Sequence, residues 1–149
     1  MLSVVIPVFN EEETLNIAAD KVKTVLKKAD IDFEIFFIDD GSTDRSWRII
    51  SELHAADRRI KGIRFSRNFG KDAAIFAGLK ACGGDCVAVM DCDLQHPPEK
   101  LPEMYGLWQQ GFEVVEGIKN ESKTTEARSL LSTEDLSIFS TSCFQNAPK

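Results

Sequence analysis

Several features that would assign a small protein to a familiar class are missing from these 149 residues. No C-x-x-C pair occurs among the four cysteines (Cys82, Cys86, Cys92 and Cys143), which argues against a zinc knuckle or a dithiol redox motif and favours reduced thiols in a cytosolic protein. No run of about 18 apolar residues is present, so the chain as given is not expected to span a membrane. The N-terminus lacks a basic segment followed by a long apolar one, so we expect no signal peptide.

Positive charge is also in short supply. The sequence holds 18 Lys and Arg against 24 Asp and Glu, for a formal net charge of −6. Binding of nucleic-acid phosphates needs a basic face, so we expect no nucleic-acid partner. An apolar share of 43% is ordinary for one globular domain with a hydrophobic core.

What the sequence does contain is a regular alternation of strand and helix patterns. Apolar, partly β-branched runs predict strands at 2–8, 33–38, 60–65 and 86–90, with a candidate fifth strand at 112–115. Between them lie helical patterns, the first with Leu15, Ala18, Ala19, Val22 and Leu26 on one face. This alternation predicts an α/β fold with a Rossmann-like, mostly parallel sheet and helices on both faces.

The turn residues predict where the helices begin. Asn10 is expected to cap the first helix, and Ser42 or Thr43 the second, while a third helix is expected over 69–79. Pro97-Pro98 is expected to open the fourth helix, because proline is tolerated in a first turn.

Polar residues gather where the predicted strands end. They are Asn10, Asp39, Asp40, Asp91 and Asp93. In parallel sheets ligands bind beyond the carboxyl ends of the strands, so we expect these residues to surround a ligand site, with Asp39, Asp91 and Phe9 around one crevice.

Asp91-Cys92-Asp93 forms a D-x-D motif directly after a buried strand. Residues i and i+2 of a strand point the same way, so both carboxylates can reach one hard cation such as Mg²⁺ or Mn²⁺. Such a cation would neutralise charge on a diphosphate leaving group. Two acids in a solvated turn remain the alternative interpretation.

Three further turns suggest a site. Asp39 and Asp40 are adjacent like charges at a strand end, and their repulsion indicates that something polar comes to lie there. Residues 7–11 lack the glycines of a G-x-G-x-x-G loop, which argues against dinucleotide binding of the usual kind. They form either a surface that supports a nucleobase or a helix cap with a buried Phe9. Arg67 and Lys71 would complement a diphosphate, unless residues 67–71 form a solvated loop.

The composition changes abruptly near the C-terminus. Residues 122–149 contain ten Ser or Thr, against eight in the 121 residues before them. We therefore predict one domain over residues 1–121 and an atypical, mobile or loosely attached tail over 122–149. The alternative for the tail is a short helix with one apolar face, formed by Leu130, Leu131, Leu136, Ile138 and Phe139.

Together, residues 3–11, 38–44, 66–71 and 90–99 resemble the family 2 glycosyltransferases with a GT-A fold, in the branch of polyprenyl-phosphate sugar transferases. The resemblance runs from about Leu2 to Ile118, and it implies that residues 1–121 are the nucleotide-sugar-binding part of a GT-A catalytic domain. It implies that the first turn and the acid after the second strand hold the nucleoside, and that the D-x-D motif with a following glutamine holds the metal. The residues implied for the donor are Pro7, Phe9, Glu11, Asp39, Asp40, Gly41, Arg67 and Lys71. Those implied for catalysis are Asp91 and Asp93, and those for the metal are Asp91, Asp93 and Gln95, with His96 either beside them or a ligand.

The resemblance implies an inverting transfer of a hexose from a nucleoside-diphosphate sugar to a polyprenyl phosphate, in the biosynthesis of a cell-wall or membrane glycan. The implied cofactor is Mg²⁺ or Mn²⁺. The implied location is cytoplasmic, at the cytoplasmic face of a membrane in the full-length family. The alternatives are a donor-binding fragment without turnover, and a haloacid-dehalogenase-type phosphatase with Asp91 as nucleophile and Asp93 as acid.

Members of that branch continue well beyond this length, usually with membrane-embedded C-terminal helices. We therefore expect a C-terminally truncated chain that contacts a membrane only through the missing segments. Loss of that part would leave apolar surface exposed, which favours self-association.

Overall fold

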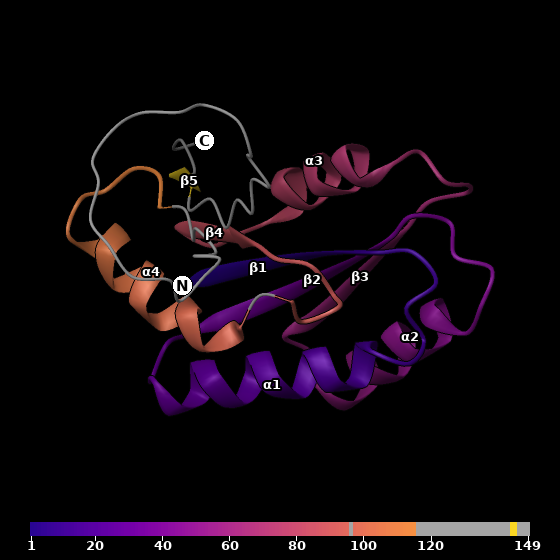
Figure 1. Cartoon of the computed structure of the whole chain (residues 1–149), viewed down its shortest axis with the longest axis horizontal. Coiled ribbons are helices and arrows are strands. Elements are labelled where there is room, and N and C mark those ends of the chain that lie inside the picture. Colours follow the sequence, from indigo (N-terminus) through magenta and orange to yellow (C-terminus); the bar gives the residue numbers. More distant parts are fainter. Residues whose placement is uncertain (96, 116–143, 146–149) are drawn as a thin grey trace, which may run out of the picture.

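The computed structural model describes residues 1–95 and 97–115, together with the backbone of residues 144–145. The elements follow one another in the order β1 (Leu2–Val8), α1 (Leu15–Lys28), β2 (Phe33–Asp39), α2 (Ser46–Ala56), β3 (Ile60–Arg64), α3 (Lys71–Ala81), β4 (Cys86–Val89), a 3₁₀ turn (Pro98–Lys100), α4 (Leu101–Gln109) and β5 (Phe144–Gln145). Figure 1 shows these elements along the chain. The predicted α/β class is confirmed.

The sheet has the strand order β3-β2-β1-β4-β5. The first four strands are parallel, and β5 pairs with β4 in the antiparallel direction. The chain therefore builds outward from β1 in one direction through β2 and β3, and then crosses back to place β4 on the other side of β1. Such a reversal of strand order leaves a crevice at the carboxyl ends of the two strands that flank it, here β1 and β4.

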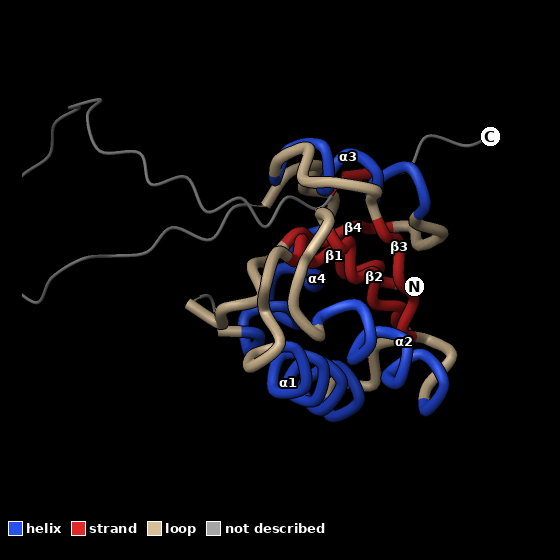
Figure 2. The backbone as a smooth tube through the Cα atoms, turned by 90° about the vertical axis from the view of Figure 1, so that its right-hand side faces the viewer, coloured by secondary structure: helices blue, strands red, loops and turns tan. Residues whose placement is uncertain are grey.

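Helices cover both faces of the sheet, as predicted (Figures 1 and 2). One core lies between the sheet and α1, α2 and α4, where Leu15, Val22 and Ile50 pack against inward side chains of β1 and β2. The second core, under α3, is smaller and includes Val5, Ile38 and Ala74. Because side chains alternate along a strand, β1 contributes Val4 and Ile6 to the first core and Val5 to the second. This sandwich holds the strand ends rigidly enough to position the loops beyond them.

Two local predictions were wrong. Residues 112–115 form no strand, because Gly111 adopts φ +100° and ends α4 in a turn in which the Phe112 N–H donates to Leu107 O. The described segment beside β4 is instead β5. The third helix spans Lys71–Ala81 rather than 69–79, because Phe69 and Gly70 are drawn into the preceding loop.

Apart from residues 144–145, the proposed tail over 122–149 lies outside the described residues, as do His96 and Cys143. Within the described part of the chain, no helix has both the length and the apolar character needed to cross a membrane.

Candidate functional site

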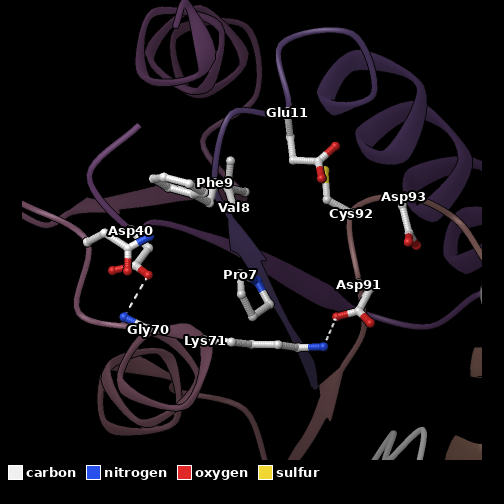
Figure 3. A pocket seen from close by; sticks show the side chains of 11 residues that line it. Pro7, Val8, Phe9, Glu11, Asp40, Gly70, Lys71, Asp91, Cys92 and Asp93 are labelled. Carbon is white, nitrogen blue, oxygen red and sulfur yellow. Dashed lines mark hydrogen bonds and ion pairs between the residues drawn. The ribbon is translucent and has the colours of Figure 1, made fainter. Parts of the chain in front are cut away.

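A cleft of about 370 Å³ opens at the carboxyl ends of β1 and β4, where the strand order reverses. It is lined by Pro7, Val8, Phe9, Glu11, Asp40, Asn68, Gly70, Lys71, Asp91, Cys92 and Asp93. Figure 3 shows the labelled side chains around the cleft, from the end of β1 and the turn after it, the end of β2, the start of α3 and the segment after β4. The cleft therefore gathers most of the predicted site residues. It also includes four residues that were not among them: Val8, Asn68, Gly70 and Cys92.

The first turn of the cleft is tied to the second one by hydrogen bonds. The Asn10 N–H donates to Ser42 Oγ at 2.9 Å, and the Thr43 N–H donates to Asn10 Oδ1 at 2.9 Å. Asn10 adopts φ +56°, a conformation that asparagine tolerates better than most residues. The prediction that Asn10 caps α1 was therefore wrong: its side chain holds residue 43, and α1 begins at Leu15.

The start of α2 also differs from the prediction. Neither Ser42 nor Thr43 caps the helix, which begins at Ser46. Asp44 instead accepts the Ser46 N–H through Oδ1 at 2.9 Å and the Glu12 N–H through Oδ2 at 3.1 Å. Burial opposes ionisation of Asp44, but the hydrogen bonds from Ser46 and Glu12 outweigh it and hold the pKa of this carboxyl below its usual value.

Phe9 lies on the wall of the cleft rather than in the core. Its side chain is 46% exposed, so the interpretation of this turn as a helix cap with a buried Phe9 was wrong. Figure 3 shows its ring between the Asp40 and Glu11 sides of the cleft. An exposed aromatic ring at this position offers a flat surface on which a base or sugar can stack.

Asp39 lies at the end of β2 and is completely buried. Its Oδ1 accepts the Ser42 N–H at 2.9 Å, and Arg64 Nε approaches Oδ2 at 3.3 Å. Oδ2 nevertheless has no hydrogen bond, although buried polar atoms normally have one. Asp39 does not line the cleft, so Asp91 and Phe9 share the crevice while Asp39 lies beneath the neighbouring turn.

The carboxylate of Asp40 has hydrogen-bond partners within the protein. Its two carboxylate oxygens accept the N–H groups of Phe69 at 2.7 Å and Gly70 at 2.9 Å. Gly41 adopts φ +73°, and a Cβ there would collide with the backbone of Arg67. Asp40 therefore needs no ligand to be tolerated, and it shapes the cleft by fixing the loop between β3 and α3.

The two basic residues of that loop have different positions. The Arg67 guanidinium lies 4.1 Å from the centroid of the Phe69 ring and does not line the cleft. Lys71 does line it, and its Nζ lies 2.6 Å from Asp91 Oδ1. Only Lys71 is thus placed beside the D-x-D motif.

Asp91 and Asp93 follow β4 and both line the cleft. Asp93 Oδ1 accepts the Gln95 N–H at 3.0 Å, while the side chain of Gln95 lies on the exposed surface outside the lining. Among the described residues, no three His, Cys, Asp or Glu side chains gather closely enough to enclose a metal. Two carboxylates still fit Mg²⁺ or Mn²⁺, because such ions are commonly held by one or two carboxylates and completed by substrate phosphates and water.

Cys92, between the two acids, joins them to the start of α1. Its buried Sγ lies 3.5 Å from Thr14 Oγ1, and that hydroxyl donates to Glu11 Oε2 at 2.6 Å. Burial raises the pKa of the Cys92 thiol to about 11, so at neutral pH the thiol is protonated and packs as a neutral group. The sequence offers no clear signal for this role, because residues 92–93 form a turn and strand alternation does not decide where the Cys92 side chain points.

The chain resembles known proteins in both sequence and fold. The sequence matches the family described as Glycosyl transferase family 2 over residues 3–144. It is 39% identical to the bactoprenol glucosyl transferase of Shigella phage SfV over 127 residues, which are 85% of this chain and 41% of that protein. It is 36% identical to the undecaprenyl-phosphate 4-deoxy-4-formamido-L-arabinose transferase of Pectobacterium atrosepticum over 88% of this chain and 40% of that protein.

A solved mannosyltransferase of Pyrobaculum calidifontis, in complex with GDP-Man and Mn²⁺, has the same fold at a TM-score of 0.66 and 19% identity, over 80% of this chain and 35% of that one. The chain thus spans about two fifths of the length of the curated relatives it matches. Since the family match covers residues 3–144 and these relatives are 39% and 36% identical over 85% and 88% of the chain, this chain belongs to glycosyltransferase family 2.

Proposed function

We propose that the cleft binds a nucleoside-diphosphate sugar together with Mg²⁺ or Mn²⁺, and that the whole protein transfers the sugar to a polyprenyl phosphate with inversion at the sugar carbon. The names of the bactoprenol and undecaprenyl-phosphate transferases support the acceptor class. The family membership favours a transferase over the phosphatase alternative.

The observation that carries this proposal is the charge of the cleft. Its described lining contains the carboxylates Glu11, Asp40, Asp91 and Asp93, and a single cationic side chain, Lys71. A diphosphate entering such a cleft would meet net repulsion, which a divalent cation on Asp91 and Asp93 removes. An acidic cleft is therefore suited to a diphosphate only when a metal accompanies it.

The remaining lining residues fit a nucleoside. Phe9 offers its exposed ring as a stacking surface, with Pro7 on the floor beneath it (Figure 3). Asp39 does not line the cleft, but its unsatisfied Oδ2 would be able to accept an N–H from a base if the 48% exposed Arg64 side chain moved away. Gln95 and Arg67 would need to turn toward the cleft to contribute as the resemblance implies.

The proposed reaction needs little from a general base. A phosphate monoester has a second pKa of about 6, so the acceptor oxygen is already anionic at neutral pH. Asp91 and Asp93 would hold the cation, which when bound would neutralise the departing diphosphate. Lys71 would donate to a diphosphate oxygen, and Phe9 would fix the nucleoside so that the sugar carbon faces the acceptor.

Titration calorimetry with UDP and GDP, with and without Mn²⁺, tests the binding step. We expect binding that requires the metal and that Asp91→Asn weakens by at least about tenfold, since it removes a charged ligand. Asp20→Asn, an exposed acid on α1, is the matched control and should bind normally. Nucleotide binding that is indifferent to both chelation and Asp91→Asn would remove the metal from the proposal.

Transfer of labelled sugar to undecaprenyl phosphate tests the second step. If the chain binds nucleotide and metal but transfers nothing, it is a donor-binding part that needs further sequence for turnover.

A further inference from the structure

We infer that Lys71 occupies, in the metal-free protein, the position on Asp91 that a divalent cation takes in the donor complex, so that metal and nucleotide bind cooperatively. This inference rests on the proposed function. It assigns Lys71 two alternating partners, the Asp91 carboxylate and the donor diphosphate.

The geometry of Lys71 suits such an exchange. It is the first residue of α3, and its Nζ lies 2.6 Å from Asp91 Oδ1 across the cleft, as Figure 3 shows. Its backbone is held in place because the preceding Gly70 N–H is bound by Asp40. Its side chain, however, is 57% exposed and free to change rotamer. Because its backbone is held in place and its side chain is exposed, Lys71 can change partner without movement of the loop.

Asp91 and Asp93 are expected to bind a metal ion only weakly when no nucleotide is present. Asp91 is paired with the ammonium, and one oxygen of Asp93 accepts the Gln95 N–H. Within the described lining, Lys71 is the sole side-chain cation, and at this distance it both neutralises Asp91 and repels an incoming divalent ion. We therefore expect weak binding of Mn²⁺ by itself.

A nucleoside diphosphate changes this balance. It offers the ammonium a partner of higher charge than one carboxylate, so Lys71 can leave Asp91 and donate to a phosphate oxygen. The freed Asp91 and the diphosphate then supply oxygen ligands to the cation together. Because coupling between two ligands is reciprocal, the nucleotide strengthens metal binding by the same factor as the metal strengthens nucleotide binding.

The test compares Mn²⁺ binding and UDP binding in wild-type protein and Lys71→Met, by electron paramagnetic resonance and calorimetry. For Lys71→Met we expect Mn²⁺ alone to bind roughly two- to fivefold more tightly, the range that loss of a surface ion pair allows. UDP in the presence of Mn²⁺ should bind roughly tenfold or more weakly, because a charge-assisted hydrogen bond is lost. A merely structural role would weaken both.

Two control variants sharpen the comparison. Lys80→Met removes a lysine from the same helix, where its Nζ lies 4.7 Å from the Phe76 ring and outside the cleft, and should change neither affinity. Lys71→Arg keeps the charge and should keep metal binding weak. Circular dichroism establishes that each variant is folded.

Unchanged or weaker binding of Mn²⁺ alone by folded Lys71→Met would overturn the inference. The proposed function fails separately, if wild-type protein binds neither UDP nor GDP in the presence of Mn²⁺.

Discussion

Asp40, at the end of β2, holds Gly70 at the start of α3 through a hydrogen bond of 2.9 Å from the Gly70 N–H to Oδ2. The second oxygen of Asp40 holds Phe69 in the same way, at 2.7 Å. One buried carboxylate thus fixes the loop that carries Lys71 into the cleft. This contact explains why an acid adjacent to Asp39 is stable without any ligand.

We expect Asp40→Ala to lower the free energy of unfolding by about 2 kcal/mol, because two backbone N–H groups lose a charged acceptor. Urea denaturation measures this loss. Asp72→Ala, an exposed acid in the first turn of α3, should cost only about 0.5 kcal/mol through the helix dipole. Equal losses in the two variants would mean that Asp40 does not fix the loop.

A polar cluster at the opposite end of the sheet should make stability depend on pH. Glu34 is 4% exposed and accepts hydrogen bonds from Ser3 Oγ at 2.6 Å, Lys61 Nζ at 2.6 Å and the Gly83 N–H at 2.7 Å. Burial opposes ionisation of Glu34, but these bonds outweigh it and hold its pKa below the usual value of 4.5.

A lowered pKa in the folded state means that this stabilisation is complete above pH 4.5 and is lost as the pH falls through the folded-state value. We expect Glu34→Gln to be less stable at pH 7 by about 1–3 kcal/mol and to lose less stability than wild type on acidification. Denaturation between pH 7 and pH 3 measures both effects. Glu103→Gln, an exposed acid on α4, serves as the control and should follow the wild-type curve. An unchanged acid dependence in Glu34→Gln would contradict the role given to this cluster.

Two helical glycines should respond in opposite ways to alanine. A Cβ at Gly78 would collide with Val5 Cγ1, so Gly78→Ala should destabilise the protein by about 1–3 kcal/mol through overpacking of α3 on the sheet. A Cβ at Gly106, in α4, meets nothing within 4 Å, so Gly106→Ala should stabilise it by about 0.5–1 kcal/mol. Thermal unfolding of both variants tests the pair, and destabilisation by Gly106→Ala would show that α4 packs differently.

Cys92 should be unreactive in the folded protein. Its thiol has a pKa of about 11 because it is buried beside Thr14, so the thiolate is about a thousandfold less abundant than the thiol at pH 8. We expect iodoacetamide to leave the Cys92 peptide unmodified at pH 8 and to label it after unfolding, as measured by mass spectrometry. Rapid labelling of the native chain would show that the segment between Asp91 and Asp93 opens.

The alternation of buried strands and amphipathic helices could be predicted from the sequence alone, because hydrophobic periodicity is a local property. The same information located Asp39, Asp40, Asp91 and Asp93 at strand ends, and parallel topology predicts that strand ends meet. The wrong predictions concern the boundaries of these elements: Asn10 cross-links two turns instead of capping α1, and residues 112–115 turn away from the sheet.

The tertiary structure alone decided which side chains meet. Asp40 binds residues 29 and 30 positions away, and Lys71 reaches Asp91 only because the crossover to β4 brings α3 beside the end of that strand. The sequence does not distinguish the two adjacent acids Asp39 and Asp40. In the structure, one carboxylate oxygen of Asp39 has no hydrogen bond, whereas both oxygens of Asp40 accept one. The reason is physical: local pattern specifies secondary structure, whereas hydrogen-bond partners across loops depend on strand order, on backbone conformations such as that of Gly41, and on the packing that fixes each rotamer.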